Sequence, residues 1–136
     1  MMKRFILSTL FILSFSVIKA QSTSPVVSQS DSVYLQTDKA PEFVGGQKKL
    51  NRYLVKTLRY PAYAVEHNIQ GTVVLQTIVE KDGSFSQLRI KTSASTDLDA
   101  EALRVIAQSP KWVPAQKDGK IVRAYHEIPV VFTLAN

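Results

Sequence analysis

The last stretch of the chain places the tightest limit on the fold. From about residue 121 to residue 134, apolar residues occupy every second position, with Ile128, Val130 and Phe132 in one phase. A period of two predicts a strand with one buried face. Pro129 lies within this strand and cannot donate a backbone hydrogen bond, so the strand should lie at a sheet edge or carry a bulge there. The chain is therefore expected to form a sheet in which this strand is at or near an edge.

Two shorter strands precede this one and are joined by a tight turn. Residues 71–80 and 85–90 carry the apolar positions, and Lys81-Asp82-Gly83 separates them. Glycine adopts a positive φ in such a turn without steric cost, which favours a hairpin. The apolar positions of the second segment fall out of phase with simple alternation, so we expect a bulge near Ser86-Gln87.

Spacings of three and four between apolar residues predict three helices. The first follows Gly45-Gly46, and Pro61 begins a shorter second helix. The third covers residues 96–109, where Thr96 and Asp99 have the spacing of a capping box. In the first helix the apolar stripe is Leu50, Tyr53, Leu54 and Leu58, and the opposite, basic face, which we expect to be solvated, is Lys48, Lys49, Arg52 and Lys56.

The elements follow one another in the order helix, helix, strand, strand, helix, strand. Helices and antiparallel strands segregated in this way form an α+β domain of two layers. We expect a sandwich of a three-stranded, or slightly larger, antiparallel sheet with the helices packed on one face. Residues 41–136 would form this domain, with Trp112 in a core of modest size.

The N-terminal residues carry a targeting pattern. Two cations precede an apolar run at 5–18, and Ala20 stands at a candidate cleavage site, so residues 1–20 are predicted to be a signal peptide. The run is shorter than the ~20 residues that cross a bilayer, which favours cleavage over retention as a membrane anchor. Residues 21–40 are rich in Ser, Thr and Gln without a period, and we expect a flexible leader. The protein is therefore expected in the periplasm, at a membrane only if the N-terminal segment is retained.

Charge and composition argue against several classes of function. Loss of Lys3, Arg4 and Lys19 with the signal peptide lowers the formal net charge from +6 by three units, to +3, which gives no case for a nucleic-acid partner. The sequence has no Cys, which excludes disulfides and a lipoprotein anchor. His67 and His126 have no further ligands at metal-binding spacing.

Catalytic patterns are also missing from the sequence. The serines between residues 84 and 95 flank no nucleophile-elbow glycines. Asp97, Asp99 and Glu101 stand where the dipole of the third helix favours acidic residues, which explains them without acid–base chemistry. We therefore expect neither an enzyme nor a cofactor.

A series of motifs runs through residues 41–136. They are Pro41-Glu42-Phe43, Gly45-Gly46, Tyr60-Pro61 followed by Ala64, Ile69 and Gly71, Gly71-x-Val73-x-Leu75, Asp82-Gly83, Leu98-Asp99-x-Glu101-Ala102, Trp112-x-Pro114-Ala115, Gly119 and Pro129-x-x-Phe132. No single motif is specific. Together, in this order and spacing, they resemble the C-terminal domain of TonB-family energy transducers in its Bacteroidetes form.

The resemblance implies a function. Such domains bind a short peptide of an outer-membrane receptor, the TonB box, as an added strand in energy-coupled transport, and edge strands are suited to this mode. Carried over, the contact residues are Tyr125, Glu127, Val131 and Thr133 of the last strand and Arg59, Tyr60 and Pro61 before the second helix. Because Pro129 cannot donate, we expect odd-numbered residues of the last strand to point their backbone groups outward.

Three further readings follow from the same features. Complete transducers of this family have a membrane anchor and a long Pro-rich spacer. Because we find neither, we expect a stand-alone module that acts as an adaptor, as a competitor or as a binder of other secreted proteins. Tyr60 before a helix-starting proline is also an ordinary packing residue. The alternative function is an envelope structural module that forms a homodimer or binds cell-wall components, since edge strands also pair with each other.

Overall fold

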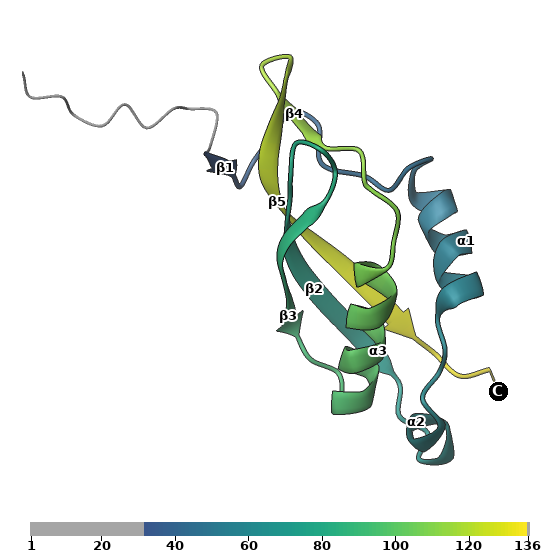
Figure 1. Ribbon diagram of the computed structural model, residues 1–136. Coiled ribbons are helices and arrows are strands. Elements are labelled where there is room, and N and C mark those ends of the chain that lie inside the picture. Colours follow the sequence, from purple (N-terminus) through teal and green to yellow (C-terminus); the bar gives the residue numbers. More distant parts are fainter. Residues whose placement is uncertain (1–31, 136) are drawn as a thin grey trace, which may run out of the picture.

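The computed structural model describes residues 32–135 (Figure 1). The signal peptide expected at 1–20, and the leader as far as residue 31, lie outside the described residues. In chain order the elements are β1 (Val33–Tyr34), α1 (Gln47–Thr57), α2 (Ala62–Glu66), β2 (Gly71–Val79), β3 (Phe85–Thr92), α3 (Thr96–Ala107), β4 (Ala115–Lys117) and β5 (Lys120–Phe132).

The sheet has the strand order β1-β5-β2-β3, and β4 forms a hairpin with the start of β5. Strand β2 pairs antiparallel with both β5 and β3, while β1 pairs with β5 in parallel. The predicted α+β class is confirmed. The sheet has more than three strands, and it is mixed because β1 pairs with β5 in parallel. The sequence did not predict β1, because a strand of two residues shows no periodicity.

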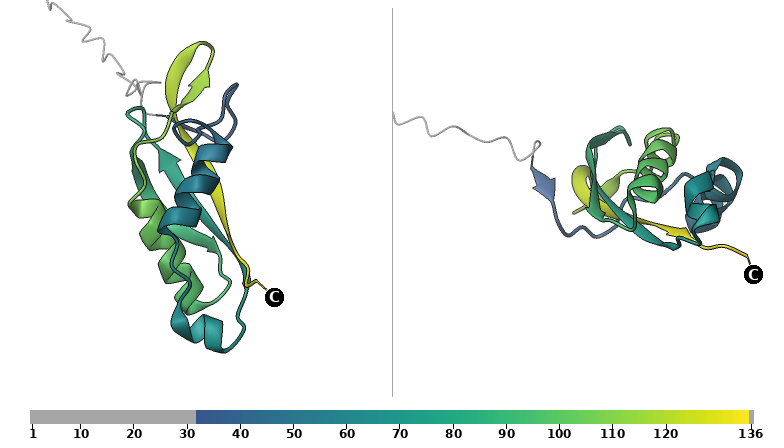
Figure 2. Two further views of the ribbon diagram at one scale, coloured as in Figure 1. Left: turned by 90° about the vertical axis from the view of Figure 1, so that its right-hand side faces the viewer. Right: turned by 90° about the horizontal axis from the view of Figure 1, so that it is seen from below.

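The helices cover one face of the sheet (Figure 2). Side chains from that face of β2 and β5 pack against α1 and α3, and the predicted core residue Trp112 is 4% exposed. The hydroxyl of Tyr53 on α1 donates to the carbonyl of Val105 on α3 at 2.8 Å, and Arg104 Nη2 donates to the carbonyl of Thr57 at 3.0 Å. These bonds join the two long helices into one layer.

The turn between β2 and β3 is as predicted and packs against Trp112. Gly83 has φ of 83°, and a Cβ built there would lie 2.0 Å from the Trp112 carbonyl oxygen. The Trp112 N–H donates to the Gly83 carbonyl at 2.9 Å. The bulge expected near Ser86-Gln87 is confirmed by a register shift in the β2–β3 ladder and by φ of 53° at Gln87.

The start of α3 differs from the prediction by one residue. Ser95, not Thr96, is the N-cap, and its side chain accepts a hydrogen bond from the Leu98 N–H at 3.2 Å. Asp99 instead accepts from the N–H of Ala94 at 3.0 Å, outside the helix. Ser and Thr both serve as N-caps, so the spacing alone did not separate these two neighbours.

Residues 32–40, which the sequence placed in the leader, contact the domain. Residues 33 and 34 pair with Arg123 and Ala124 of β5. The N–H groups of residues 38 and 39 both donate to the Gln116 carbonyl at 3.0 Å, and an Asp38 carboxylate oxygen accepts from the Asp118 N–H at 2.8 Å. The described end of the leader is thus held against the β4–β5 hairpin.

Candidate functional site

Strand β5 has one fully paired edge and one that is mostly open. Its register with β2 runs without a shift from Gly71↔Phe132 to Val79↔Ala124. On the opposite edge, β1 pairs only with Arg123 and Ala124. Within residues 32–135 no other strand pairs with that edge between Tyr125 and Phe132. We call this stretch the open edge.

Pro129 fixes which backbone groups face the open edge. It stands opposite Val74 in an uninterrupted ladder, yet it has no N–H to give to β2. A proline fits such a ladder only where its nitrogen points away from the partner strand. Since successive residues point their backbone groups to opposite edges, the groups of Glu127 and Val131 share the direction of Pro129 and face outward.

Two hollows flank the open edge. One, of about 190 Å³, is bordered by Pro41, Phe43, Leu50 and Trp112 on one side and by residues 126–129 of β5 on the other. The second, of about 530 Å³, lies between residues 35–41 and residues 125–127. The open edge is therefore flanked by the residues that line these two hollows. Helix α1 lies beyond this edge in Figure 1.

The four predicted contact residues of β5 lie on its exposed face or at its end. Val131 is 59% exposed and Tyr125 36% exposed, and Glu127 and Thr133 are exposed as well. Glu127 forms an ion pair with Lys91 of β3 across the sheet. Sequence reasoning missed this pair, since nothing in the sequence aligns residues from strands that are not neighbours.

Tyr60 lies close to the end of β5. Its ring meets that of Phe132 edge-on, with centroids 5.6 Å apart, and its hydroxyl donates to the Ile69 carbonyl at 2.6 Å. The ring is half-buried, so Tyr60 has a packing role in the free protein. The structure brings the Tyr60-Pro61 segment and the C-terminal end of β5 together, as the resemblance implied.

Arg59 is oriented by α3. Its backbone N–H donates to Glu101 Oε1 at 2.7 Å, and the same carboxylate pairs with Arg104 at 2.6 Å. The hydrogen bond from Arg104 holds the pKa of Glu101 below its ordinary value. Glu101 is thus an anchoring carboxylate rather than a proton donor.

The two histidines lie in different surroundings. His126 packs edge-on against Trp112, with ring centroids 5.6 Å apart, and burial lowers its pKa. His67 stacks on Tyr63 at the exposed surface of α2, with centroids 4.0 Å apart. No group of three or more potential metal ligands occurs among residues 32–135. In the same residues, no helix combines the length and hydropathy needed to cross a bilayer.

Comparison with known proteins gives a family and two solved structures. A family model described as Gram-negative bacterial TonB protein C-terminal matches residues 56–134. The NMR solution structure of Helicobacter pylori TonB-CTD (residues 179–285) is 21% identical, with a TM-score of 0.49 over 65% of this chain and 80% of that one. The structure of its residues 194–285 is 20% identical, with a TM-score of 0.48 over 63% and 90%. The search of curated proteins gave no match.

Proposed function

Because the chain belongs to the family of Gram-negative bacterial TonB protein C-terminal domains, and is in that sense a TonB-like energy-transducer domain, we propose that it binds a receptor peptide by strand addition. The peptide is the TonB box of an outer-membrane transporter. It pairs with the open edge of β5 in energy-coupled transport across the envelope. In this proposal the protein is a binding module and has no catalytic role.

The open edge is the observation that carries the proposal. Unpaired backbone groups facing outward provide the main affinity in strand addition, and alternate side-chain pockets provide selectivity. The outward groups of Glu127 and Val131 supply the pairing, with Pro129 as a gap between them. The hollow bordered by Phe43, Leu50 and Trp112 receives side chains from one face of the added strand.

The Tyr60-Pro61 segment is proposed to contact the peptide where it passes the end of β5. Support comes from the contact of the Tyr60 ring with Phe132, the last residue of that strand. Arg59 is exposed beside it, with its backbone fixed by Glu101. Thr133, which follows β5, completes this end of the proposed contact surface.

The location and domain limits form part of the same proposal. We infer that residues 1–20 direct export to the periplasm and that residues 21–31 link them to the domain. The binding module is then formed by residues 41–136 together with residues 32–40, which pack against them. Export is supported by the two cations and the apolar run at 5–18 in the sequence. A membrane contact then depends on whether the N-terminal segment stays attached.

A peptide titration tests the binding mode. Synthetic peptides of roughly eight residues, the length of a strand that spans the open edge, are taken from the TonB boxes of Bacteroidetes outer-membrane receptors. They are added to ¹⁵N-labelled protein, and amide shift changes are expected at the non-proline residues of 125–133 and at Arg59 and Tyr60. Changes confined to the helices would reject strand addition at β5.

Blocked peptides make the test sharper. Methylating the backbone nitrogens of every second residue removes the donors on one edge of the peptide only. Two peptides methylated in opposite phases should therefore differ, one binding like the parent and the other not at all. Equal binding of both would show that backbone pairing does not hold the peptide.

A further inference from the structure

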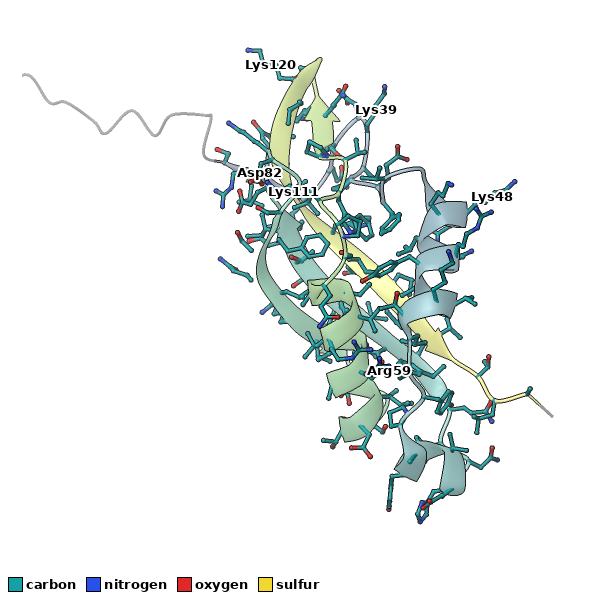
Figure 3. All side chains as sticks on the ribbon, turned by 45° about the vertical axis from the view of Figure 1, so that its right-hand side comes forward. Lys39, Lys48, Arg59, Asp82, Lys111 and Lys120 are labelled. Carbon is teal, nitrogen blue, oxygen red and sulfur yellow. The ribbon has the colours of Figure 1, made fainter. Side chains whose placement is uncertain are left out.

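A second hollow lies at the end of the molecule where the described chain begins. It has a volume of about 280 Å³, and it is formed by β1, the turn after β2 and the β4–β5 hairpin. Its lining residues are Ser32, Tyr34, Lys81, Lys117, Asp118, Lys120, Ile121 and Val122. Figure 3 shows Lys120 at the tip of the hairpin, far from Lys48 on α1. We call this hollow the lysine hollow.

Positive charge dominates the lysine hollow. Three of its lining side chains are ammonium groups from three separate elements, and Asp118 is the single carboxylate in the lining. In the described part of the chain none of Lys81, Lys117 and Lys120 forms an ion pair. Lys117 lies over the Tyr34 ring, 5.6 Å from its centroid, which fixes the ammonium group without neutralising it.

The carboxylate that precedes Lys81 in the sequence already has partners. Glu80, next to Lys81 in sequence, accepts from Arg123 Nε at 2.5 Å and from the Ser86 hydroxyl at 2.6 Å. The hydrogen bond from Arg123 lowers the pKa of Glu80. Glu80 is thus directed to Arg123 and not to the three lysines.

The hairpin brings two of the lysines directly opposite each other. Lys117 and Lys120 are cross-strand partners on either side of the turn, where Asp118 has φ of 51° and Gly119 φ of 74°. Like charges at opposite positions of an antiparallel pair destabilise it. An anion placed between them would remove that repulsion, so this sequence favours a ligand with negative charge.

We propose that the lysine hollow binds a phosphate group. Lysine is a compact point charge that suits phosphate, and several of them around one hollow can share its oxygens. The volume of about 280 Å³ leaves room for a phosphate group together with the organic part of an ester. The ligand is therefore a phosphate ester, either soluble or in the headgroup of an anionic lipid.

The first experiment titrates the full chain with inorganic phosphate at constant ionic strength. Saturable amide shift changes are expected at Lys81 and at residues 117–122. They should disappear in a triple variant with Lys81→Gln, Lys117→Gln and Lys120→Gln. The matched control has the same loss of charge on α1, with Lys48→Gln, Lys49→Gln and Lys56→Gln, and should respond like the parent.

The second experiment separates the two sources of phosphate. All three proteins are floated with vesicles of phosphatidylcholine, with and without phosphatidylglycerol. A lipid source predicts that the hollow variant loses about a hundredfold in affinity for the anionic vesicles relative to the control, since each lysine near such a surface contributes roughly fivefold. A soluble ester predicts that the variants bind vesicles equally and differ only toward inorganic phosphate.

The apolar run at 5–18 is present in all three proteins, so differences between them report the lysines. The proposal is overturned if phosphate shifts are unsaturable, or if the hollow variant and the α1 control lose binding equally. Either outcome would mean general ionic attraction. None of the six substituted lysines belongs to the core, although Lys117 is half-buried. Unchanged spectra elsewhere confirm that each variant is folded.

Discussion

His126 couples the stability of the domain to pH. Burial against Trp112 holds its pKa below the ordinary value of 6.5, opposed by the charge of Glu127. The unfolded chain therefore binds a proton more readily than the folded one. The free energy of unfolding is expected to be greatest above pH 6.5 and to fall as the pH drops below it. Urea denaturation over a series of pH values measures this.

Replacing each histidine separately identifies which residue makes the free energy of unfolding fall as the pH drops. In His126→Gln the fall between neutral and mildly acidic pH should be abolished, whatever the change in overall stability. In His67→Gln it should remain, because His67 lies at the exposed surface of α2. A slope that persists in His126→Gln would assign the effect to another group.

Gly83 and Gly119 both have positive φ but differ in the space around them. A Cβ at Gly83 would lie 2.0 Å from the Trp112 carbonyl oxygen, whereas nothing lies within 4 Å of one at Gly119. Gly119→Ala should cost about 1 kcal/mol for the left-handed conformation alone. Gly83→Ala should cost about 1–3 kcal/mol more, because backbone atoms must move. Equal losses in urea denaturation would contradict this contact.

At the scale of elements, the structure and the sequence pattern assign different N-caps to α3: Ser95 in the structure and Thr96 in the pattern. Ser95→Ala removes the acceptor for the Leu98 N–H and should cost about 1 kcal/mol. Thr96→Ala changes an exposed residue and should stay within about 0.5 kcal/mol. Thermal or urea unfolding of the two variants decides between the caps. A larger loss in Thr96→Ala would restore the sequence-based assignment.

The open edge of β5 can be tested at a single outward position. Val131→Pro removes an N–H that β2 does not use, so the fold should be retained while the Kd of a receptor peptide rises about tenfold, the value of one hydrogen bond. Val131→Ala shortens the same side chain but keeps the N–H, and its Kd should change by no more than about threefold. Similar affinities for both variants would show that this donor is not used.

The elements that the sequence predicted are those long enough to repeat. Apolar residues alternate with polar ones in 121–132, and they recur every three or four positions in 47–57 and 96–107. Each of these elements buries one face against the core. Strands β1 and β4 contain two and three residues, too few for a period. Their pairing is set by tertiary contacts, which local pattern does not record.

Local sequence pattern was equally uninformative about the buried face of helix α2 and about part of the candidate site. Ala62, Ala64 and Val65 are all small or apolar, yet only Ala64 is buried. A helix of five residues has no second turn that would show its inner face. At the site, Pro129 marked the edge position of β5 in the sequence, whereas the occupation of part of that edge by β1 became visible only in the fold.

At the scale of the whole molecule, both ends of the sheet carry features that discourage pairing between copies. The β5 edge contains Pro129, and the other end of the sheet is β3, where Arg89 and Lys91 are exposed. Proline and lysine at edges are common means of preventing aggregation. The protein alone is therefore expected to be a monomer at all practical concentrations, measured by light scattering after size exclusion.

A concentration-dependent dimer without any peptide would favour the alternative function, in which this edge pairs with a second copy. The same measurement with peptide present should show one peptide for each chain. Two chains for each peptide would indicate that one peptide pairs with the β5 edge of one copy and with the β3 edge of another.

The short strand β1 gives the binding surface a fixed length. It ends at Tyr34, opposite Ala124, and the pairing positions left to a guest extend only from Tyr125 to Phe132, roughly 27 Å of extended chain. A longer guest meets the protein's own backbone at one end and must turn away from the sheet. The open edge thus limits the length of peptide that can pair with it, and the protein selects a peptide by the length of its extended segment as well as by its side chains.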